Sequence, residues 1–548
     1  MLNLKSGYFY FLAIKISLFK IIKKINFKTN FYNSSLKSKI PKQFFFFPNA
    51  FLLSSFTSYK NFSLKISNID PYKFWEKQGT KKGEESLQSF FWLNLIDRKN
   101  DASIIRKIIS LWINKNKKYT SEIWDSSVTS KRIISWIFNA DIILNSTNFD
   151  FKNDFLESTI IQINHLKKNY NFEKDETIKI EILSTIILSG LIFKEYKKNY
   201  DFGINELKKI TESFFDDSGF PISRNPNDLL KFSKYFVLIK ECLNGAQEYI
   251  PDFLDEIIEK NLVCLKSIAG PRNMLPLFNG ATEINLDGYF DYLTNLNFKI
   301  KITNDVFGGL KILKSKKDVI FFDIGQLPKK NYSKNYQSGP LSFEYYFNSE
   351  KIITNCGYGK NISKKAELLS RLTSAQSTLS INNTSVINFE RNKLLNNAFG
   401  NSLKGNFKVS SIDYGKNNKD FYANALHDAF VNNYGYIHKR SIYIDKGNNN
   451  FIGTDELIPK NNSAAFNFAI RFHLYPGLDA AKTIGGDSIL IKVKKNQSLI
   501  FIAKDQSINV EKSIFLARNK ILSNLCITIA GSLMGEKKTI NWEFRKNI

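Results

Sequence analysis

The chain has 548 residues, with 78 Lys or Arg against 51 Asp or Glu and a formal net charge of +27 at pH 7. Its hydrophobic fraction of 43% and aromatic fraction of 14% exclude a disordered protein, and its length predicts two or three domains with large buried cores. The cations comprise 67 Lys and only 11 Arg, spread along the whole chain. We therefore interpret the excess charge as a solvated lysine surface and expect no nucleic-acid partner.

The four cysteines, Cys242, Cys264, Cys356 and Cys526, lie far apart and form no C-x-x-C pair. This spacing supports neither a zinc knuckle nor a disulfide scaffold, so we expect reduced core residues. The sequence also lacks the Walker A, G-x-G-x-x-G, H-E-x-x-H and G-x-S-x-G patterns. Nucleotide chemistry and metalloprotease chemistry are therefore not favoured.

Residues 1–65 form a basic, aromatic leader, and lysines interrupt the apolar stretches of residues 1–24. No uninterrupted apolar region precedes a small-residue cleavage site, so no clean signal peptide can be read. The apolar runs at 44–56 and 182–193 are shorter than the roughly 20 residues that span a bilayer. Two interpretations stay open for the leader: a poorly packed segment, or a peripheral contact of residues 1–60 with an anionic membrane.

Residues 66–300 show helical periodicity, for example in the apolar stripe from Ile104 to Ile113. Further helices are expected at 133–144, 152–170, 176–195, 204–215, 226–244 and 251–267. Short connections between them predict antiparallel hairpins packed side by side. Five of the six tryptophans lie in this half, where they favour core packing over stacking on sugar rings: Trp75, Trp92, Trp112, Trp124 and Trp136.

Residues 301–548 change to short β-rich runs bounded by Gly, Asn, Asp and Lys. Apolar and polar residues alternate at 441–444 and 489–493, and the polar run at 445–450 predicts a turn between two strands. Many strands without intervening helices predict an antiparallel β-sandwich. The predicted fold class is thus a two-domain α+β protein, with helical hairpins followed by a sandwich.

Several motifs resemble the heparinase II/III-like family of polysaccharide lyases. They are SRNP at 223–226, LFNGA at 277–281, RLTSAQSTL at 371–379, HD at 427–428, YIHKRSIY at 436–443, DEL at 455–457 and FAIRFHLYPG at 468–477. The resemblance implies an incomplete α/α toroid at 66–300 and a heparinase II/III-like β-sandwich at 301–548. It also implies cofactor-free β-elimination on an acidic polysaccharide that contains uronic acid, which would be the partner of this protein.

This reaction builds negative charge on the uronate carboxylate, so cations or amide donors must face it. The substrate-binding candidates are Arg224, Asn225, Arg371, Gln376, Arg440 and Arg471. A base and an acid must move protons, and Tyr and His serve in these lyases. The catalytic candidates are Tyr289, Tyr292, His427, His438 and His473, whereas His165 is expected to be an ordinary surface or helix-packing residue.

Two positions depart from the family pattern. Relatives commonly place a His where this chain has Gln376, and a Tyr-His pair follows the proline equivalent to Pro226, where this chain has Asn227 and Asp228. Gln cannot act as a base at neutral pH. A metal site known in such sandwiches is not assembled by the sequence, and His427, Asp428 and His473 are its nearest candidates.

Two functions follow from these observations. The first is a lyase-like enzyme that cleaves acidic glycans in the cell envelope, with a periplasmic location. The second is a glycan-binding or envelope-associated relative without catalysis. A cytoplasmic location is the alternative, because no clean signal peptide is readable.

Overall fold

The computed structural model describes most of the chain, and the statements below concern these residues: 2–57, 66, 69–76, 81–97, 100–145, 149–302, 304–400, 402–416, 420–445, 450–460, 465–494 and 497–547. The turn predicted at 445–450 lies largely outside them. Two compact units interleave along the sequence. Unit 1 comprises Met1–Phe215, Leu230–Lys260 and Gly288–Lys299, and unit 2 comprises Asp216–Leu229, Asn261–Asp287 and Ile300–Ile548.

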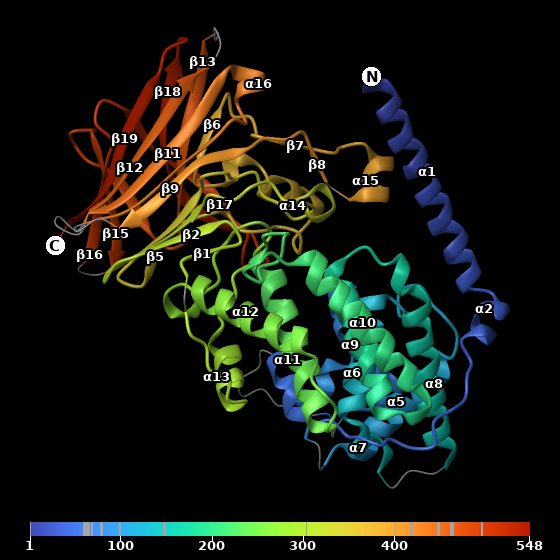
Figure 1. Cartoon of the computed structure of the whole chain (residues 1–548). Coiled ribbons are helices and arrows are strands. Elements are labelled where there is room, and N and C mark those ends of the chain that lie inside the picture. Colours follow the sequence, from blue (N-terminus) through green and yellow to red (C-terminus); the bar gives the residue numbers. More distant parts are fainter. Residues whose placement is uncertain are drawn as a thin grey trace. The chain divides into compact units, whose positions relative to one another are not determined.

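The first half of the chain is helical (Figure 1). Its helices are α1 (Leu2–Phe27), α2 (Asn30–Ser35), α3 (Pro71–Phe74), α4 (Lys81–Gln88), α5 (Ala102–Lys115), α6 (Ser126–Phe138), α7 (Ala140–Leu144), α8 (Phe149–Asn169), α9 (Glu176–Ile192), α10 (Lys197–Phe214), α11 (Pro226–Gly245), α12 (Asp252–Ile268) and α13 (Asp287–Asn295). The predicted periodic segments therefore form helices. Among the described helices, none combines the length and the apolar character needed to cross a bilayer.

An aromatic cluster forms part of the core of unit 1. The Phe90 ring packs edge-on against Trp112 and Trp136, at centroid distances of 5.8 and 5.4 Å, and stacks on Trp92 at 5.5 Å. Trp112 and Trp136 are 1% and 0% exposed. These indoles are therefore core residues, and no face of theirs is available to stack on a sugar.

Unit 2 is built on antiparallel strands: β1 (Val306–Phe307), β2 (Leu310–Lys314), β3 (Asp318–Asp323), β4 (Phe343–Phe347), β5 (Glu350–Thr354), β6 (Leu379–Ile381), β7 (Asn388–Phe389), β8 (Leu403–Lys404), β9 (Val409–Lys416), β10 (Asp420–His427), β11 (Tyr436–Asp445), β12 (Asn450–Pro459), β13 (Phe466–Leu474), β14 (Asp479–Lys482), β15 (Ser488–Lys494), β16 (Gln497–Ile502), β17 (Ser507–Phe515), β18 (Leu522–Leu533) and β19 (Lys538–Asn547). One sheet has the order β1-β2-β3-β4-β5-β13-β18-β17, with β6 paired to β13. The other has the order β14-β15-β16-β19-β12-β11-β10-β9. Three short helices lie between strands: α14 (Lys364–Ser370), α15 (Lys393–Phe399) and α16 (Val431–Tyr434).

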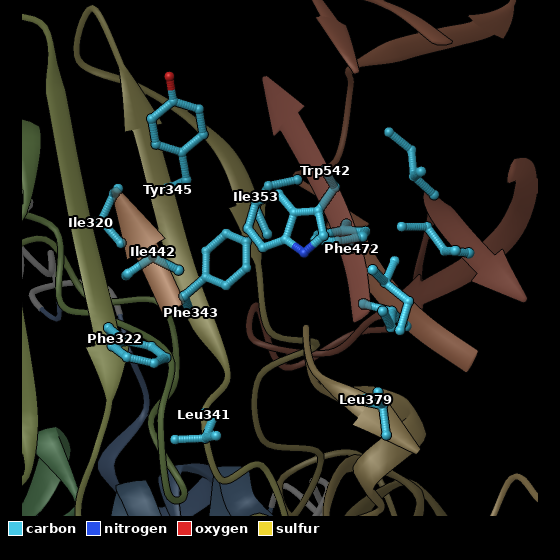
Figure 2. Close-up of a cluster of buried hydrophobic side chains, with 14 of the residues drawn as sticks. Ile320, Phe322, Leu341, Phe343, Tyr345, Ile353, Leu379, Ile442, Phe472 and Trp542 are labelled. Atoms are coloured by element: carbon cyan, nitrogen blue, oxygen red, sulfur yellow. The ribbon is translucent and has the colours of Figure 1, made fainter. Parts of the chain in front are cut away.

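Side chains from both sheets share one hydrophobic core (Figure 2). Phe343 on β4 stacks on Trp542 of β19 with ring centroids 5.6 Å apart. Phe472 on β13 meets the same indole edge-on at 4.9 Å. Burial of this apolar surface holds the two sheets face to face, as expected for a β-sandwich.

Candidate functional site

The SRNP segment forms a tight turn that starts helix α11. Pro226 occupies the first helical position, where its missing N–H costs nothing. The Asn225 side-chain oxygen accepts a hydrogen bond from the backbone N–H of Asn227 at 2.9 Å, which caps the helix. Arg224 adopts a left-handed conformation with φ 59°. This turn directs the Arg224 and Asn225 side chains into the protein.

The Arg224 guanidinium is committed to groups of unit 2. It donates to the backbone oxygens of Gly308 and Gln326 at 2.9 and 3.0 Å, and it forms an ion pair with buried Asp323. Burial raises the pKa of Asp323, and the neighbouring Arg224 cation opposes that rise. A side chain at Gly325 would collide with the guanidinium, since its Cβ would lie 2.3 Å from Arg224 Cζ. Arg224 therefore ties the start of α11 to the end of β3.

Asn225 belongs to a buried polar network. Its amide nitrogen donates to Asp228 Oδ1 at 3.2 Å, and the Ser223 hydroxyl donates to Asp228 Oδ2 at 2.7 Å. A Cβ built on Gly280 would lie 3.0 Å from Asn225 Nδ2 and 2.6 Å from Asn335 Cβ, so Asn225 and Asn335 flank this glycine. The LFNGA motif thus packs directly on the SRNP turn.

Gln337 connects this turn to the RLTSAQSTL motif. Its side-chain oxygen accepts from the Gly280 N–H at 3.1 Å, and its amide nitrogen donates to the backbone oxygens of Gly357 and Ser370 at 3.1 and 2.7 Å. The Gln376 amide nitrogen donates to the same Ser370 oxygen at 2.8 Å. Gln376, which is 1% exposed, therefore joins the network through a shared acceptor.

Arg371 and Tyr358 complete the network. Arg371 Nε and Nη2 donate to the backbone oxygens of Tyr336 and Ser333, at 2.9 and 3.0 Å. The Tyr358 hydroxyl donates to Glu367 at 2.9 Å and lies 3.2 Å from Asn335 Oδ1. Burial raises the pKa of Tyr358, as do the charges of Glu367 and Asp228, whereas the Arg371 cation opposes the rise. We call the set Asn225, Asp228, Asn335, Gln337, Tyr358, Arg371 and Gln376 the amide network.

Three residues next in sequence to Asp228 or Gln337 have a buried polar atom without a hydrogen-bond partner. These atoms are Asn227 Oδ1, Tyr336 Oη and Ser338 Oγ, among thirteen such atoms in the described residues. An unsatisfied buried polar group costs about 1–3 kcal/mol. Such atoms are expected where a polar ligand or water completes the hydrogen bonding.

His427, His438 and Arg440 lie inside the sandwich, each 0% exposed. His438 lies 3.1 Å from His427 and 2.6 Å from Asp455, and Arg440 donates to both carboxylate oxygens of Asp455, at 2.8 and 3.0 Å. The N–H of Ala429 donates to His427 Nδ1 at 3.3 Å, so His427 Nε2 carries its proton and donates to His438, which in turn donates to Asp455. We call His427, His438, Arg440 and Asp455 the sandwich relay.

The sandwich relay favours neutral histidines. Burial lowers the pKa of both His427 and His438, and the Arg440 cation adds to this effect. Asp455 remains ionised, because Arg440 holds its pKa well below the usual range against the effect of burial. The packing hydrogen-bonds these groups to one another inside the sandwich, and the catalytic and binding roles predicted for them stay predictions.

His473 and Arg471 on β13 are placed near the network without joining it. His473 Nε2 donates to the Ser374 oxygen at 3.0 Å, and its Nδ1 accepts from Ser513 at 2.9 Å. Burial lowers the pKa of His473 to about 4. Arg471 donates to Ser380 and Asn383 at 2.8 and 2.7 Å. Uncharged oxygen partners, from the backbone, hydroxyl groups and the Asn383 side-chain amide, therefore hold both side chains in place.

Tyr289 and Tyr292 belong to unit 1, on α13. Their rings stack with centroids 5.9 Å apart. Tyr289 Oη lies 2.8 Å from Ser233 Oγ, and Tyr292 donates to the Leu52 oxygen at 3.3 Å. Burial raises the pKa of both hydroxyls. Both hydroxyls are therefore held in the protonated form, as is that of Tyr358.

The structure thus unites Asn225, Arg371 and Gln376, with Arg224 beside them, and places the remaining candidates elsewhere. Tyr358, Asn335 and Gln337 were missed, because they lie in loops without periodicity and match no motif. Of the network residues outside the candidate list, only Asp228 was noted in the sequence, where it stands in place of part of the family's Tyr-His pair. In the described part of the chain, no group of three or more His, Cys, Asp or Glu side chains could hold a metal. His427 and His473, which were candidate metal ligands, form hydrogen bonds to protein groups.

Residues 306–543 match the family described as "Heparinase II/III-like, C-terminal". The resemblance noted in the motifs of this part of the chain is therefore confirmed.

Solved structures extend the similarity to both halves of the chain. The crystal structure of heparan sulfate lyase HepC from Pedobacter heparinus has a TM-score of 0.61 at 13% identity, covering 99% of this chain and 88% of that one. A heparinase III crystal structure gives a TM-score of 0.66 at 14% identity, covering 91% of this chain and 85% of that one. The predicted fold class, an α/α toroid followed by a β-sandwich, is confirmed. No curated protein matches the sequence.

Proposed function

We propose that this protein cleaves an acidic polysaccharide containing uronic acid by β-elimination, as a cell-envelope enzyme of the lyase type. The observation that carries the proposal is the amide network, which gathers the side-chain amides of Asn225, Gln337 and Gln376 with the Arg371 cation in one buried region. The fold supports it, because proteins named heparan sulfate lyase and heparinase III share it along most of the chain. Asn225 and Tyr358 are 2% and 4% exposed, so groups around them must open to admit a polymer.

The reaction makes specific demands on these residues. A base removes the proton from the carbon next to the uronate carboxylate, the bond from the neighbouring carbon to the glycosidic oxygen breaks, and a double bond forms between the two carbons. An acid protonates the departing oxygen, so atoms and electrons balance without water or a redox partner. Amide N–H groups such as that of Asn225 would stabilise the charge that develops on the carboxylate.

Tyrosine is the candidate proton carrier in this proposal. Tyr358 is the tyrosine of the amide network; burial and the Glu367 carboxylate raise its pKa, and the Arg371 cation opposes that rise, so the protonated phenol is suited to donate a proton to the departing oxygen. Tyr289 and Tyr292 remain candidates from unit 1.

Gln376 favours a second function, glycan binding without turnover. Its amide can donate to a glycan but cannot exchange a proton at neutral pH, and it occupies the position where the family commonly has a His. In that case the amide network would recognise the acidic glycan and leave it intact.

One experiment separates the two functions. Purified full-length protein is incubated with a panel of acidic polysaccharides, and the ultraviolet absorbance of the unsaturated uronate product is followed. We expect product from the parent, at least a tenfold lower rate for Tyr358→Phe, and a lower rate for Asn225→Ser, which can keep the helix cap but lacks the amide donor. Gln506→His, at a half-buried position outside the amide network, is the matched control for Gln376→His.

The outcomes distinguish the proposals. Product formation that is insensitive to Tyr358→Phe would remove Tyr358 from the mechanism. Absence of product from every polysaccharide, together with binding on a glycan array, would establish the binding function. Turnover that appears only in Gln376→His and not in Gln506→His would show that this single position abolished catalysis.

A further inference from the structure

The N-terminal helix α1 presents an apolar stripe to solvent. Its members recur at helical spacing and are all largely exposed: Phe11 (65%), Ile14 (47%), Leu18 (54%), Ile21 (55%), Ile22 (63%) and Ile25 (63%). We call these six residues the outer stripe. At 100° per residue they fall within an arc of about 100°, which is the width of a face that a helix normally buries.

The opposite side of α1 is anchored to unit 1. Ala13 is 0% and Phe27 is 9% exposed, and the Phe27 ring packs on Tyr32 and Tyr119 at centroid distances of 4.6 and 4.8 Å. Lys23 places its ammonium 4.4 Å from the centroid of the Phe172 ring. The helix is therefore fixed by its inner side, and the outer stripe is not the face that holds it to the protein.

Charge identifies the occupant of the outer stripe. Residues 2–57 contain nine lysines and no aspartate or glutamate. Lys15 and Lys24 are exposed and lie on the two flanks of the stripe. A second copy of this chain would bring the same positive charges together, and a nucleic acid would leave the apolar side chains without a partner. An anionic bilayer satisfies both features, since its acyl region takes the apolar groups and its headgroups take the lysines.

We propose that α1 is a membrane-docking helix that lies in the plane of an anionic bilayer, with the outer stripe inserted at the boundary between headgroups and acyl chains. The stripe extends over 15 residues, or about 22 Å at 1.5 Å per residue. This proposal is independent of the proposed function.

Vesicle flotation tests the proposal with full-length protein. Vesicles of phosphatidylcholine are compared with vesicles that also contain phosphatidylglycerol, and we expect binding to the anionic vesicles only. The stripe variant Leu18→Gln/Ile22→Gln/Ile25→Gln should bind at least tenfold more weakly, because Gln maintains the helix but removes the apolar contacts. Phe149→Gln on α8, where Phe149 is 75% exposed, is the matched control and should bind like the parent.

Charge and insertion depth are tested separately. Each of Lys15→Gln and Lys24→Gln should weaken binding by about fivefold. The four native cysteines are buried, so a fluorophore attached to Leu18→Cys would report on that position alone. Its emission should shift to the blue on anionic vesicles and remain unchanged on neutral ones.

Three results would overturn the proposal. They are absence of binding to anionic vesicles, unchanged binding of the stripe variant, and formation of dimers by the parent that the stripe variant abolishes. The last result would show that a second copy covers the outer stripe.

Discussion

At the scale of single residues, burial and hydrogen bonding set the protonation state of the candidate groups. The sandwich relay illustrates this, because each hydrogen bond fixes the proton position of the next group. Asp455 is its single carboxylate, and it accepts bonds from Arg440, His438 and the Trp542 indole. A sequence shows residue types but not exposure, so His438 and a solvent-facing catalytic histidine look alike until the strands are paired.

The sandwich relay predicts a large effect of Asp455→Asn on stability. The substitution leaves Arg440 as a buried cation without its counter-charge, for which the expected loss is about 3–5 kcal/mol. Urea unfolding followed by circular dichroism measures it. Asp413→Asn, at an exposed position on β9 of the same sheet, should change stability by less than about 0.5 kcal/mol. Equal losses in the two variants would contradict the role assigned to the relay.

At the scale of elements, helices α9 and α10 form an antiparallel pair that depends on small residues. A Cβ at Gly190 would lie 2.3 Å from the Tyr200 backbone nitrogen, and one at Gly203 would lie 2.4 Å from Ile187 Cγ1. Gly190 thus lies opposite Tyr200, and Ile187, earlier on α9, lies opposite Gly203, later on α10. This order of contacts is that of an antiparallel hairpin. Short predicted connections indicated such hairpins, whereas the sequence pattern did not reveal this close approach.

Gly190→Ala should therefore destabilise unit 1. The added methyl meets backbone rather than a mobile side-chain end, so the helices must separate, at an expected cost of about 1–3 kcal/mol. Thermal and urea unfolding monitored by helical circular dichroism measure this cost. Gly7→Ala in α1, where a Cβ meets nothing within 4 Å, is the control. It should be neutral or stabilise the protein slightly, and a loss as large as that of Gly190→Ala would contradict the packing argument.

The elements that the sequence predicted are those with a buried face. The alternation in β15 is visible because Ile489 and Ile491 are buried while Leu490 is exposed. Strands β9 and β17 were not predicted, and they lie at the ends of the two sheets; the inner strands β2, β5 and β10 were not predicted either. An edge strand such as β9 exposes most of its side chains. Because few of its positions must be apolar, its sequence shows no alternation of apolar and polar residues.

At the scale of the whole molecule, the fold class could be predicted because it depends on motifs and on periodicity over hundreds of residues. The candidate site could be predicted only in part, because it depends on which loops meet. Asn225 and Gln376 lie 151 positions apart in sequence, and they are connected through Gln337 and the backbone of Ser370, for which no motif gave a signal.

All four histidines of the molecule are buried. This burial predicts that the molecule loses stability as the pH falls below 6.5. Burial lowers the pKa of His473 to about 4 and that of His165 to about 3, and it also lowers the pKa of His427 and His438. In the unfolded chain the histidines have pKa values near 6.5 and bind protons below that pH. In the folded protein the same histidines stay unprotonated until the pH reaches their lowered pKa values. The stabilisation is therefore complete above about pH 7 and falls by up to about 1.4 kcal/mol per pH unit for each histidine between pH 6.5 and the folded pKa.

Urea midpoints at pH 7.5, 6.5 and 5.5 measure this effect, with tryptophan fluorescence as the readout. If the two units unfold in separate transitions, unit 2 should be the more pH-sensitive, because it contains three of the histidines and unit 1 contains only His165. His473→Gln, in which an amide can still donate to the Ser374 oxygen, should reduce the pH dependence of unit 2 by about one third. Midpoints that do not change between pH 7.5 and 5.5 would show that the histidines become protonated without unfolding, and that the burial of the sandwich relay is transient.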